Sequence, residues 1–264
     1  MNGLPRDGTQ SRFVTSSIKF RTSRTVLQNL FPPGSKQWRF ASPATNAFAS
    51  ISQTTLDGME WLGGKGYNFI CLFLHGVLYT SDSGKVVNGM YMACIMENLC
   101  DPIITGRDEL GMPKVFSEID RIKGKTSQIV TTSWRSAEWG CFEWQGLEEV
   151  PQDAQQGMMG GADAGEGILA ARYFPAVGAK NRGKPESNCV VLDRFADSSM
   201  KPTIKRVLKA KTANISLQAG TEQDLPTLHY ITSRLAEIPV YEVVDAKIVE
   251  GTGVADLSHI NPVE

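Results

Sequence analysis

The spacing of short apolar segments constrains the fold of this chain more than any other feature. Ten segments have the length and alternation of β-strands, and turn-forming Gly, Pro, Asn and Asp residues separate them. These segments are residues 13–20, 47–55, 68–78, 90–97, 128–133, 140–144, 170–175, 188–193, 203–208 and 214–217. Helix signals are confined to residues 23–30, with Ser23 as the N-cap, and to residues 225–235. The pattern predicts an α+β fold with mostly antiparallel β-structure and a sheet that closes on itself.

The chain of 264 residues is long enough for one large domain or two small ones, and it contains no internal repeat. We expect a loose leader over residues 1–12 and a single domain over residues 13–264. Residues 152–167 are rich in Gly, Ala and Gln and poor in large apolar groups, which predicts a surface loop inserted in the sheet. This loop is either a tolerated insertion or a lid over a pocket.

Charge and apolar content exclude several classes of partner. The net charge is −1 and no run of Lys or Arg occurs, so a basic face for nucleic acid is not expected. The longest apolar run, residues 69–74, is too short to span a membrane, and the polar first residues contain no secretory signal. The five cysteines form no CxxC pair, so no zinc site is expected. These features predict a cytoplasmic protein that binds no metal.

Residues 101–120 contain the strongest candidate for a catalytic residue. Lys114 follows Pro113 and lies among four apolar residues, Leu110, Met112, Val115 and Phe116. An apolar pocket removes hydration from an ammonium group and so favours the neutral amine, which is the form that attacks a carbonyl carbon. The alternative is a lysine whose long side chain reaches from an apolar strand to water.

The same segment resembles the signature of a known family. Gly106-Arg107, five further residues and then Pro113-Lys114 are similar to the GRExxxxPK signature of the acetoacetate decarboxylase superfamily, with Asp108 in place of the signature Glu. Residues 19–33 resemble the N-terminal strand and helix of that family. Residues 207–257 are similar to its C-terminal strand, helix and closing strand. The resemblance implies a closed, barrel-like cone of strands with a few helices, and Lys114 as the Schiff-base lysine.

The resemblance implies a cofactor-independent lyase acting on a β-keto acid or another activated ketone. The lysine condenses with the ketone, and the iminium accepts electrons as a bond to the adjacent carbon breaks. One alternative is aldolase, dehydratase or cyclase chemistry on a bulkier, polyketide-like ketone of secondary metabolism, which the tryptophans at 134, 139 and 144 would suit as a pocket lining. A second alternative is a noncatalytic small-molecule binding protein that retains the pocket. Family members assemble, so a homo-oligomer is also expected.

Two departures from the family pattern bear on the substrate. The family's decarboxylases carry a second lysine directly after the first, where this chain has Val115. The family's acidic residue on the strand before the signature is replaced by Lys65, Tyr67 or Asn68, depending on the alignment. Val115 removes a cation and favours apolar groups, so we expect a larger and more hydrophobic ketone than acetoacetate. Met112 and Val115 are the apolar residues expected to contact it.

Two residues are candidates for acid–base catalysis with Lys114. Glu97 follows an apolar strand and is either a general acid or base or a strand-end carboxylate in an ion pair. His75 lies inside an apolar run and is either a proton shuttle or a hydrogen-bonded core histidine.

Three more residues are candidates for binding the substrate or shaping the site. Tyr67 is either a phenol that contacts a substrate oxygen or a packed aromatic. Arg12 is the candidate for the family's N-terminal pocket arginine, but its spacing to Arg21 is one residue off, which in a strand reverses the side. Arg107 is expected in a structural ion pair.

Overall fold

The computed structural model describes residues 7–264 apart from 33–35, 156–166, 195–196, 199, 255–256 and 258. The described residues form a twelve-stranded sheet and a four-stranded sheet. The large sheet comprises β1 (Arg12–Ser23), β2 (Trp38–Phe40), β3 (Asn46–Met59), β4 (Lys65–Thr80), β5 (Val86–Glu97), β6 (Lys114–Phe116), β10 (Glu148–Glu149), β11 (Gly167–Pro175), β12 (Pro185–Asp193), β13 (Thr203–Lys209), β15 (Glu242–Thr252) and β16 (Asn261–Pro262). The small sheet comprises β7 (Glu118–Lys123), β8 (Ser127–Trp134), β9 (Ala137–Gln145) and β14 (Thr212–Leu217).

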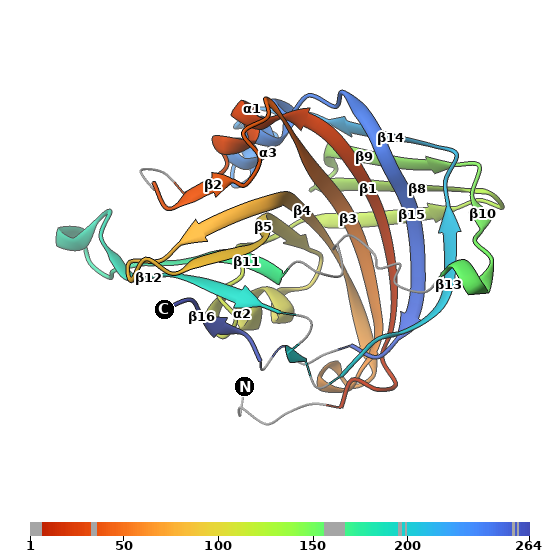
Figure 1. The fold of residues 1–264 in the computed structure, drawn as a ribbon, viewed down its shortest axis with the longest axis horizontal. Coiled ribbons are helices and arrows are strands. Elements are labelled where there is room, and N and C mark those ends of the chain that lie inside the picture. The colour runs from red at the N-terminus through yellow and green to blue at the C-terminus, as the bar shows by residue number, and fades with distance from the viewer. Residues whose placement is uncertain are drawn as a thin grey trace.

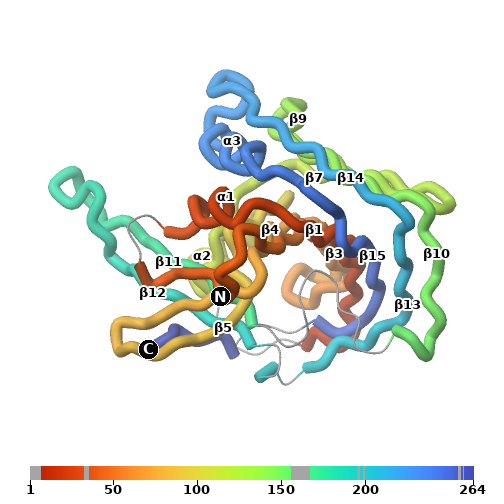
Figure 2. Tube along the Cα trace, turned by 45° about the horizontal axis from the view of Figure 1, so that its top comes forward, coloured from red at the N-terminus to blue at the C-terminus, as the bar shows by residue number. Residues whose placement is uncertain are grey.

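The main path of the large sheet is β10-β13-β15-β1-β3-β4-β5-β11-β12-β16, with β2 added at β4 and β6 added at β5. The pairs β5–β6 and β5–β11 are parallel, and the other pairs are antiparallel. The large sheet is strongly twisted and curved (Figures 1 and 2). The expected mostly antiparallel α+β fold is confirmed.

Each of the ten strands expected from alternation lies on an observed strand. The pattern did not mark the short strands β2, β6, β10 and β16, nor β7 and the long β15, although the family resemblance implied a closing strand in the β15 region. Strand β15 contains the charged residues Asp245 and Lys247 among its apolar residues, and the two form an ion pair with Nζ 3.0 Å from Oδ2. Of the expected loop 152–167, residues 156–166 lie outside the described residues, residues Gln152–Ala154 form the 3-10 turn η2, and Gly167 begins β11.

The helices follow their local signals to different degrees. The first, α1 (Arg24–Gln28), is capped by Ser23, whose hydroxyl accepts a hydrogen bond from Val26 N at 3.4 Å, as expected. The helix expected at residues 225–235 is α3 (His229–Ala236), shorter at its N-terminal end. The sequence did not predict α2 (Cys100–Asp108), which contains Pro102 in its first turn and Gly106 near its end. Two further 3-10 turns are η1 (Glu60–Leu62) and η3 (Ala179–Asn181).

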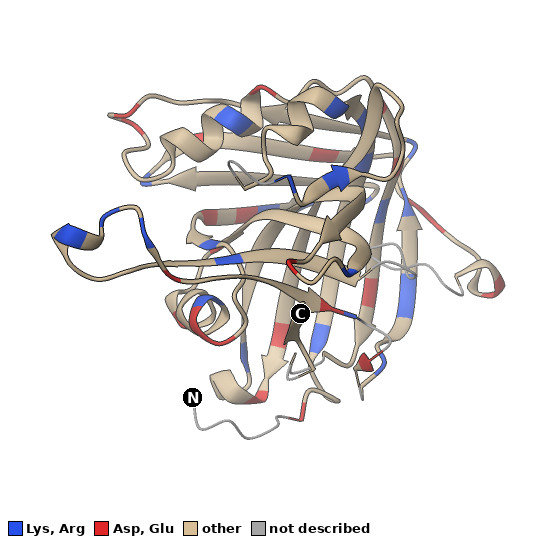
Figure 3. Cartoon of the chain, turned by 60° about the vertical axis from the view of Figure 1, so that its left-hand side comes forward, with Lys and Arg blue, Asp and Glu red and all other residues tan. Residues whose placement is uncertain are grey.

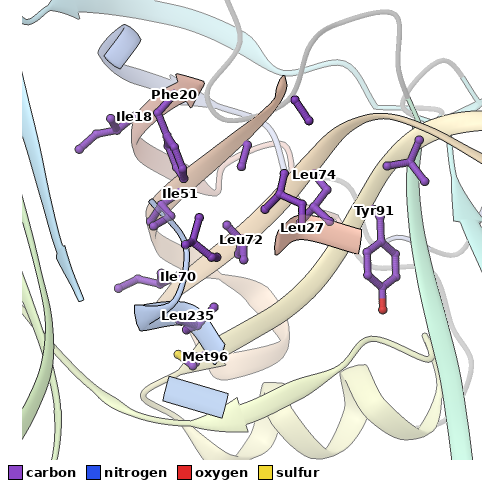
Figure 4. Packing of buried hydrophobic residues seen from close by; sticks show 14 of the residues in the cluster. Ile18, Phe20, Leu27, Ile51, Ile70, Leu72, Leu74, Tyr91, Met96 and Leu235 are labelled. Carbon is purple, nitrogen blue, oxygen red and sulfur yellow. The ribbon is translucent and has the colours of Figure 1, made fainter. Parts of the chain in front are cut away.

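The two faces of the large sheet belong to different hydrophobic clusters. The core face, defined by Ile18, Ile51, Ile70 and Leu72, packs against the small sheet, α1 and α3 in the main hydrophobic cluster (Figure 4). The opposite face, defined by Cys71, Phe73 and Ile95 and called the lysine face below, belongs to a second cluster that includes Met112. Side chains alternate between these faces along β4 and β5, so the register decides which residues meet on each.

The tryptophans of β9 belong to the core. Trp139 and Trp144 are both 1% exposed in the main cluster, so they do not line a substrate pocket as one alternative expected. Trp144 Nε1 donates a hydrogen bond to Ser17 O of β1 at 3.1 Å, and Trp139 Nε1 donates to Ser117 Oγ at 3.0 Å. The first bond connects the two sheets across the core, and the second connects β9 to the residue that links β6 to β7.

Figure 3 shows positions of Lys and Arg mixed with positions of Asp and Glu along the strands, helices and loops. In the described part of the chain, no helix is both long enough and apolar enough to cross a membrane.

We expect Trp144→Phe to lower the free energy of unfolding by about 1–3 kcal/mol, because it removes a buried hydrogen-bond donor and leaves space where the indole was. The measurement is urea denaturation followed by circular dichroism and fluorescence. Tyr230→Phe, at a residue that is 67% exposed, is the control and should change stability by less than about 0.5 kcal/mol. An equal effect of the two changes would contradict the role given to Trp144.

Candidate active site

The backbone around Lys114 fixes which way its side chain points. Strand β6 runs parallel to β5 with Lys114 beside Ile95, and Ile95 N donates to Pro113 O at 3.2 Å. Paired residues of neighbouring strands point to the same side of a sheet, so Lys114 lies on the lysine face with Ile95. Val115 points the other way and packs against the main cluster on the core face.

The amine of Lys114 is enclosed, as expected from its apolar neighbours. The residue is 5% exposed. Its Nζ lies 2.7 Å from Glu97 Oε1 and donates a hydrogen bond to the carbonyl oxygen of Pro102 in α2 at 3.1 Å. The amine is therefore held between the end of β5 and one side of α2.

Two residues of α2 shape the path of the lysine side chain. A Cβ atom at Gly106 would lie 2.3 Å from Cε, 2.5 Å from Cδ and 2.5 Å from Nζ of Lys114, so only glycine leaves room at this position. Arg107 Nη1 donates to the backbone oxygen of Lys114 at 3.0 Å. Among the described residues, Arg107 makes this backbone contact, which holds β6 against α2, and not the structural ion pair that was expected. The Gly-Arg part of the signature thus positions its lysine.

Glu97 is the charged partner of Lys114 and is 0% exposed. It lies on the lysine face because it pairs with Phe69 of β4 and Phe116 of β6. Burial raises the pKa of the Glu97 carboxyl above its ordinary value, and the neighbouring Lys114 opposes part of that rise. Oε1 lies at ion-pair distance from Nζ, and Oε2 has no hydrogen-bond partner among the described residues.

Two more titratable groups lie in the field of this pair. Burial raises the pKa of the Tyr67 phenol, and the negative charge of Glu97 raises it further. Burial also raises the pKa of the Cys71 thiol, with Glu97 adding to the rise and Lys114 opposing it. Both residues are therefore protonated neutral groups near neutral pH. Cys71, which sequence reasoning did not select, is in register with Ile95 and so is one strand further from Lys114.

The structure brings Lys114 and Glu97 into contact and places Tyr67 two residues along β4 from Phe69, the partner of Glu97, but it places two other candidates elsewhere. His75 Nε2 lies 2.9 Å from Ser50 Oγ, and His75 is four residues along β4 from Cys71, which corresponds to about 13 Å. Arg12 is at the start of β1, its side chain is 63% exposed, and it pairs with Asp57. Neither residue contacts Lys114 in this arrangement.

Met112 and Val115, the two apolar residues expected to contact the substrate, lie on different faces of the sheet. Met112 is 7% exposed and belongs to the cluster of the lysine face, beside the lysine that it was expected to accompany. Val115 lies on the core face, so its expected contact with a substrate held at Lys114 is wrong. A second lysine at this position would point away from the amine of Lys114 for the same reason.

Chemically, the site offers one enclosed amine, one buried carboxyl group and one phenol. An amine beside a group that exchanges its proton is the requirement for nucleophilic attack on a carbonyl carbon. In the described residues, no three His, Cys, Asp or Glu side chains are grouped in a way that would hold a metal ion.

Comparison with known proteins identifies the fold. No protein-family model and no curated protein sequence matches the chain. A structure of acetoacetate decarboxylase superposes with a TM-score of 0.67 at 11% identity, covering 98% of this chain and 89% of that one. Acetoacetate decarboxylase from Legionella pneumophila gives 0.62 at 14% identity, covering 96% and 88%. The enduracididine biosynthesis enzyme MppR, complexed with pyruvate, gives 0.62 at 11% identity, covering 100% and 92%.

These matches cover nearly the whole of this chain, so the chain has the acetoacetate decarboxylase-like fold that its signature implied. At this level of identity the similarity concerns the fold. The chemistry has to be inferred from the residues of this chain.

We expect Gly106→Ala to destabilise the protein by about 1–3 kcal/mol, because the new methyl group overlaps the Lys114 side chain. The cost should be smaller in a Lys114→Ala background, where the overlapping atoms are gone. A double-mutant cycle by urea denaturation measures this coupling. Thr105→Ala in the same helix is the control and should show no coupling. Equal costs in both backgrounds would contradict the contact.

The Lys114→Met variant should show a stability that depends strongly on pH. Lys114 opposes the raised pKa of Glu97, so its removal raises that pKa further. The folded state then holds the Glu97 proton more tightly than the unfolded chain does. Stability therefore falls as pH rises from the unfolded value of about 4.3 through the folded value.

Urea denaturation across this pH range measures the effect. The double variant Lys114→Met/Glu97→Gln has no titrating carboxyl at the site and should lose that decline. If the single and double variants follow the same pH profile, Glu97 does not titrate as the structure indicates.

Proposed function

We propose that this chain is a cofactor-independent Schiff-base lyase in which Lys114 condenses with a β-keto acid or another activated ketone. The observation that carries the proposal is the enclosed Lys114 amine, 2.7 Å from the carboxylate oxygen of Glu97 and 5% exposed. The fold and the signature around Lys114 support it. An enclosed amine with a proton acceptor at contact distance is what imine formation requires.

Glu97 has the position and the environment of the acid–base group. Transfer of a proton from Nζ to Oε1 turns the ion pair into a neutral amine and a carboxylic acid. The raised pKa of Glu97 favours this direction, because burial disfavours two charges more than two neutral groups. The amine then attacks the ketone carbon, and the carboxylic acid donates its proton to the carbonyl oxygen, which forms a carbinolamine.

The next step releases water and creates an electron acceptor. Glu97 takes the second proton from the nitrogen and passes it to the carbinolamine hydroxyl, which leaves as water, and a protonated imine remains on Lys114. When a bond to the adjacent carbon breaks, its electron pair moves to the imine nitrogen and gives an enamine. The lost group is carbon dioxide in a β-keto acid or an aldehyde in a retro-aldol reaction. A proton from Glu97 or Tyr67 onto the enamine carbon, followed by hydrolysis, restores the free lysine.

A second candidate is aldol or dehydration chemistry on an uncharged ketone, and one observation favours it. Lys114 is the one cation within ion-pair distance of Glu97 among the described residues. Once Lys114 has formed an imine, a substrate carboxylate would lie near Glu97 without a second cation to hold it. An uncharged ketone avoids this repulsion. The preference for an uncharged ketone therefore follows from Glu97. It does not follow from Val115, whose side chain is on the other face of the sheet.

We expect sodium borohydride to trap a single acetone or acetoacetate adduct on Lys114, because reduction makes the imine bond permanent. Intact mass and peptide mapping locate the adduct. Lys114→Arg should give none, since a guanidinium stays charged and forms no imine. Lys125→Arg, at an exposed lysine in a turn, is the matched control and should label as the unaltered protein does.

Carbon dioxide release from acetoacetate, measured in the same preparations, separates the two reactions. Release that depends on Lys114 supports decarboxylation, whereas an adduct without release supports chemistry on the carbon skeleton. A protein that binds ketones but forms no adduct at Lys114 would be the noncatalytic binding protein, and the proposal would be wrong.

A further inference from the structure

Three aromatic residues lie in a row that begins at the Lys114–Glu97 pair. Phe69 is in register with Glu97, and Tyr67 lies two residues further along β4, on the same face. The ring centroids of Tyr67 and Phe69 are 5.8 Å apart, and those of Trp61 and Tyr67 are 6.5 Å apart with an interplanar angle of 73°. We call Trp61, Tyr67 and Phe69 the aromatic row.

The direction of the lysine side chain connects it to this row. Strand pairing places Lys114 beside Ile95, and Ile95 beside Cys71, yet the amine contacts Glu97, which is level with Phe69. The reactive atom is thus turned toward the end of β4 that carries the row. Burial raises the pKa of the Tyr67 phenol and the charge of Glu97 adds to the rise, which agrees with this position of Tyr67.

The hydrophobic core does not account for the outer part of the row. Trp61 and Tyr67 are partly exposed, and among the described residues neither belongs to a hydrophobic cluster, while Phe69 packs at the edge of the second one. Trp61 sits in η1, and this turn and the left-handed Gly63 and Gly64 that follow it connect β3 to β4. The row therefore extends from the buried pair to the surface at the β3–β4 connection.

We propose that the aromatic row binds an aromatic ring of the substrate whose carbonyl group reacts with Lys114. This inference rests on the proposed function and specifies the substrate class. A ring that joins Tyr67 and Trp61 can make the same offset and edge-to-face contacts that these residues make with each other. Phe69 and Tyr67 are two residues apart on β4, which corresponds to about 7 Å along the strand. A substrate that reacts at Lys114 and places its ring at Tyr67 would therefore carry the ring about three bonds from its carbonyl carbon. The substrate is an aryl-alkyl ketone.

Two ketones of matched shape test this substrate class. The probes are 4-phenylbutan-2-one and 4-cyclohexylbutan-2-one, with acetone as the reference that lacks a ring. Borohydride trapping on Lys114 at a series of concentrations gives the half-saturating concentration for each. We expect the phenyl ketone to half-saturate at about tenfold lower concentration than the cyclohexyl ketone, from two aromatic contacts.

Variants of the row assign the preference to its residues. Trp61→Leu and Tyr67→Leu should each reduce the phenyl-to-cyclohexyl ratio about two- to tenfold. Tyr67→Phe keeps the ring and should keep the ratio. Tyr230→Leu removes an aromatic residue that is 67% exposed in α3 and should leave the ratio unchanged.

Each result decides between the two proposals. If acetone and both ring ketones give no adduct, the Schiff-base function fails. If acetone is trapped but the ratio is near one, the function stands and the aromatic site is wrong. If the phenyl-to-cyclohexyl ratio stays high in both Trp61→Leu and Tyr67→Leu, the aromatic site is also wrong. A lower molecular mass of Trp61→Leu by light scattering would overturn it too, because the row would then be a contact between subunits.

Discussion

The site depends on a contact between an amine and a carboxylate that are both removed from water. Lys114 and Glu97 come from different strands, and α2 closes the space beside them with the carbonyl oxygen of Pro102 and the missing side chain of Gly106. Breaking a buried pair leaves an uncompensated charge, so each partner constrains the other. The register of β4, β5 and β6 sets the distance between the Lys114 amine and the Glu97 carboxylate. Helix α2 covers the amine on its other side.

The source of the carboxylate distinguishes this chain from the family pattern that its signature resembles. The family's acidic position falls on β4, where this chain has Lys65, Tyr67 or Asn68. Here the carboxylate is Glu97 on β5, and cross-strand pairing brings it level with Phe69 on the lysine face. A group from a neighbouring strand reaches the amine as well as one from β4 would, because adjacent strands are only about 5 Å apart. The phenol of Tyr67 remains at the β4 side of the pair.

Strand geometry also explains why sequence neighbours of Lys114 gave a mistaken view of its surroundings. Val115 is adjacent in the chain but lies on the opposite face, whereas Met112 and Glu97 are separated from Lys114 by two and seventeen positions and lie beside it. Pro102 and Gly106 weaken the local helix signal, so α2 could not be read from the sequence. The helix forms because its residues pack against β5 and β6. Arg12 and His75 illustrate the same point, since partners at Asp57 and Ser50 hold them away from the amine.

By itself, the sequence determined the positions of ten strands, the mostly antiparallel class and the lysine around which the site is built. Alternation of apolar residues encodes burial locally, and the Gly-Arg and Pro-Lys pairs mark one short segment. Only the tertiary structure decided which carboxylate meets that lysine, which face Val115 takes, and where the aromatic row of Trp61, Tyr67 and Phe69 leads. These outcomes depend on register between strands and on packing of a helix against a sheet. A shift of one residue in register reverses every side chain, and no local pattern in the chain fixes that register.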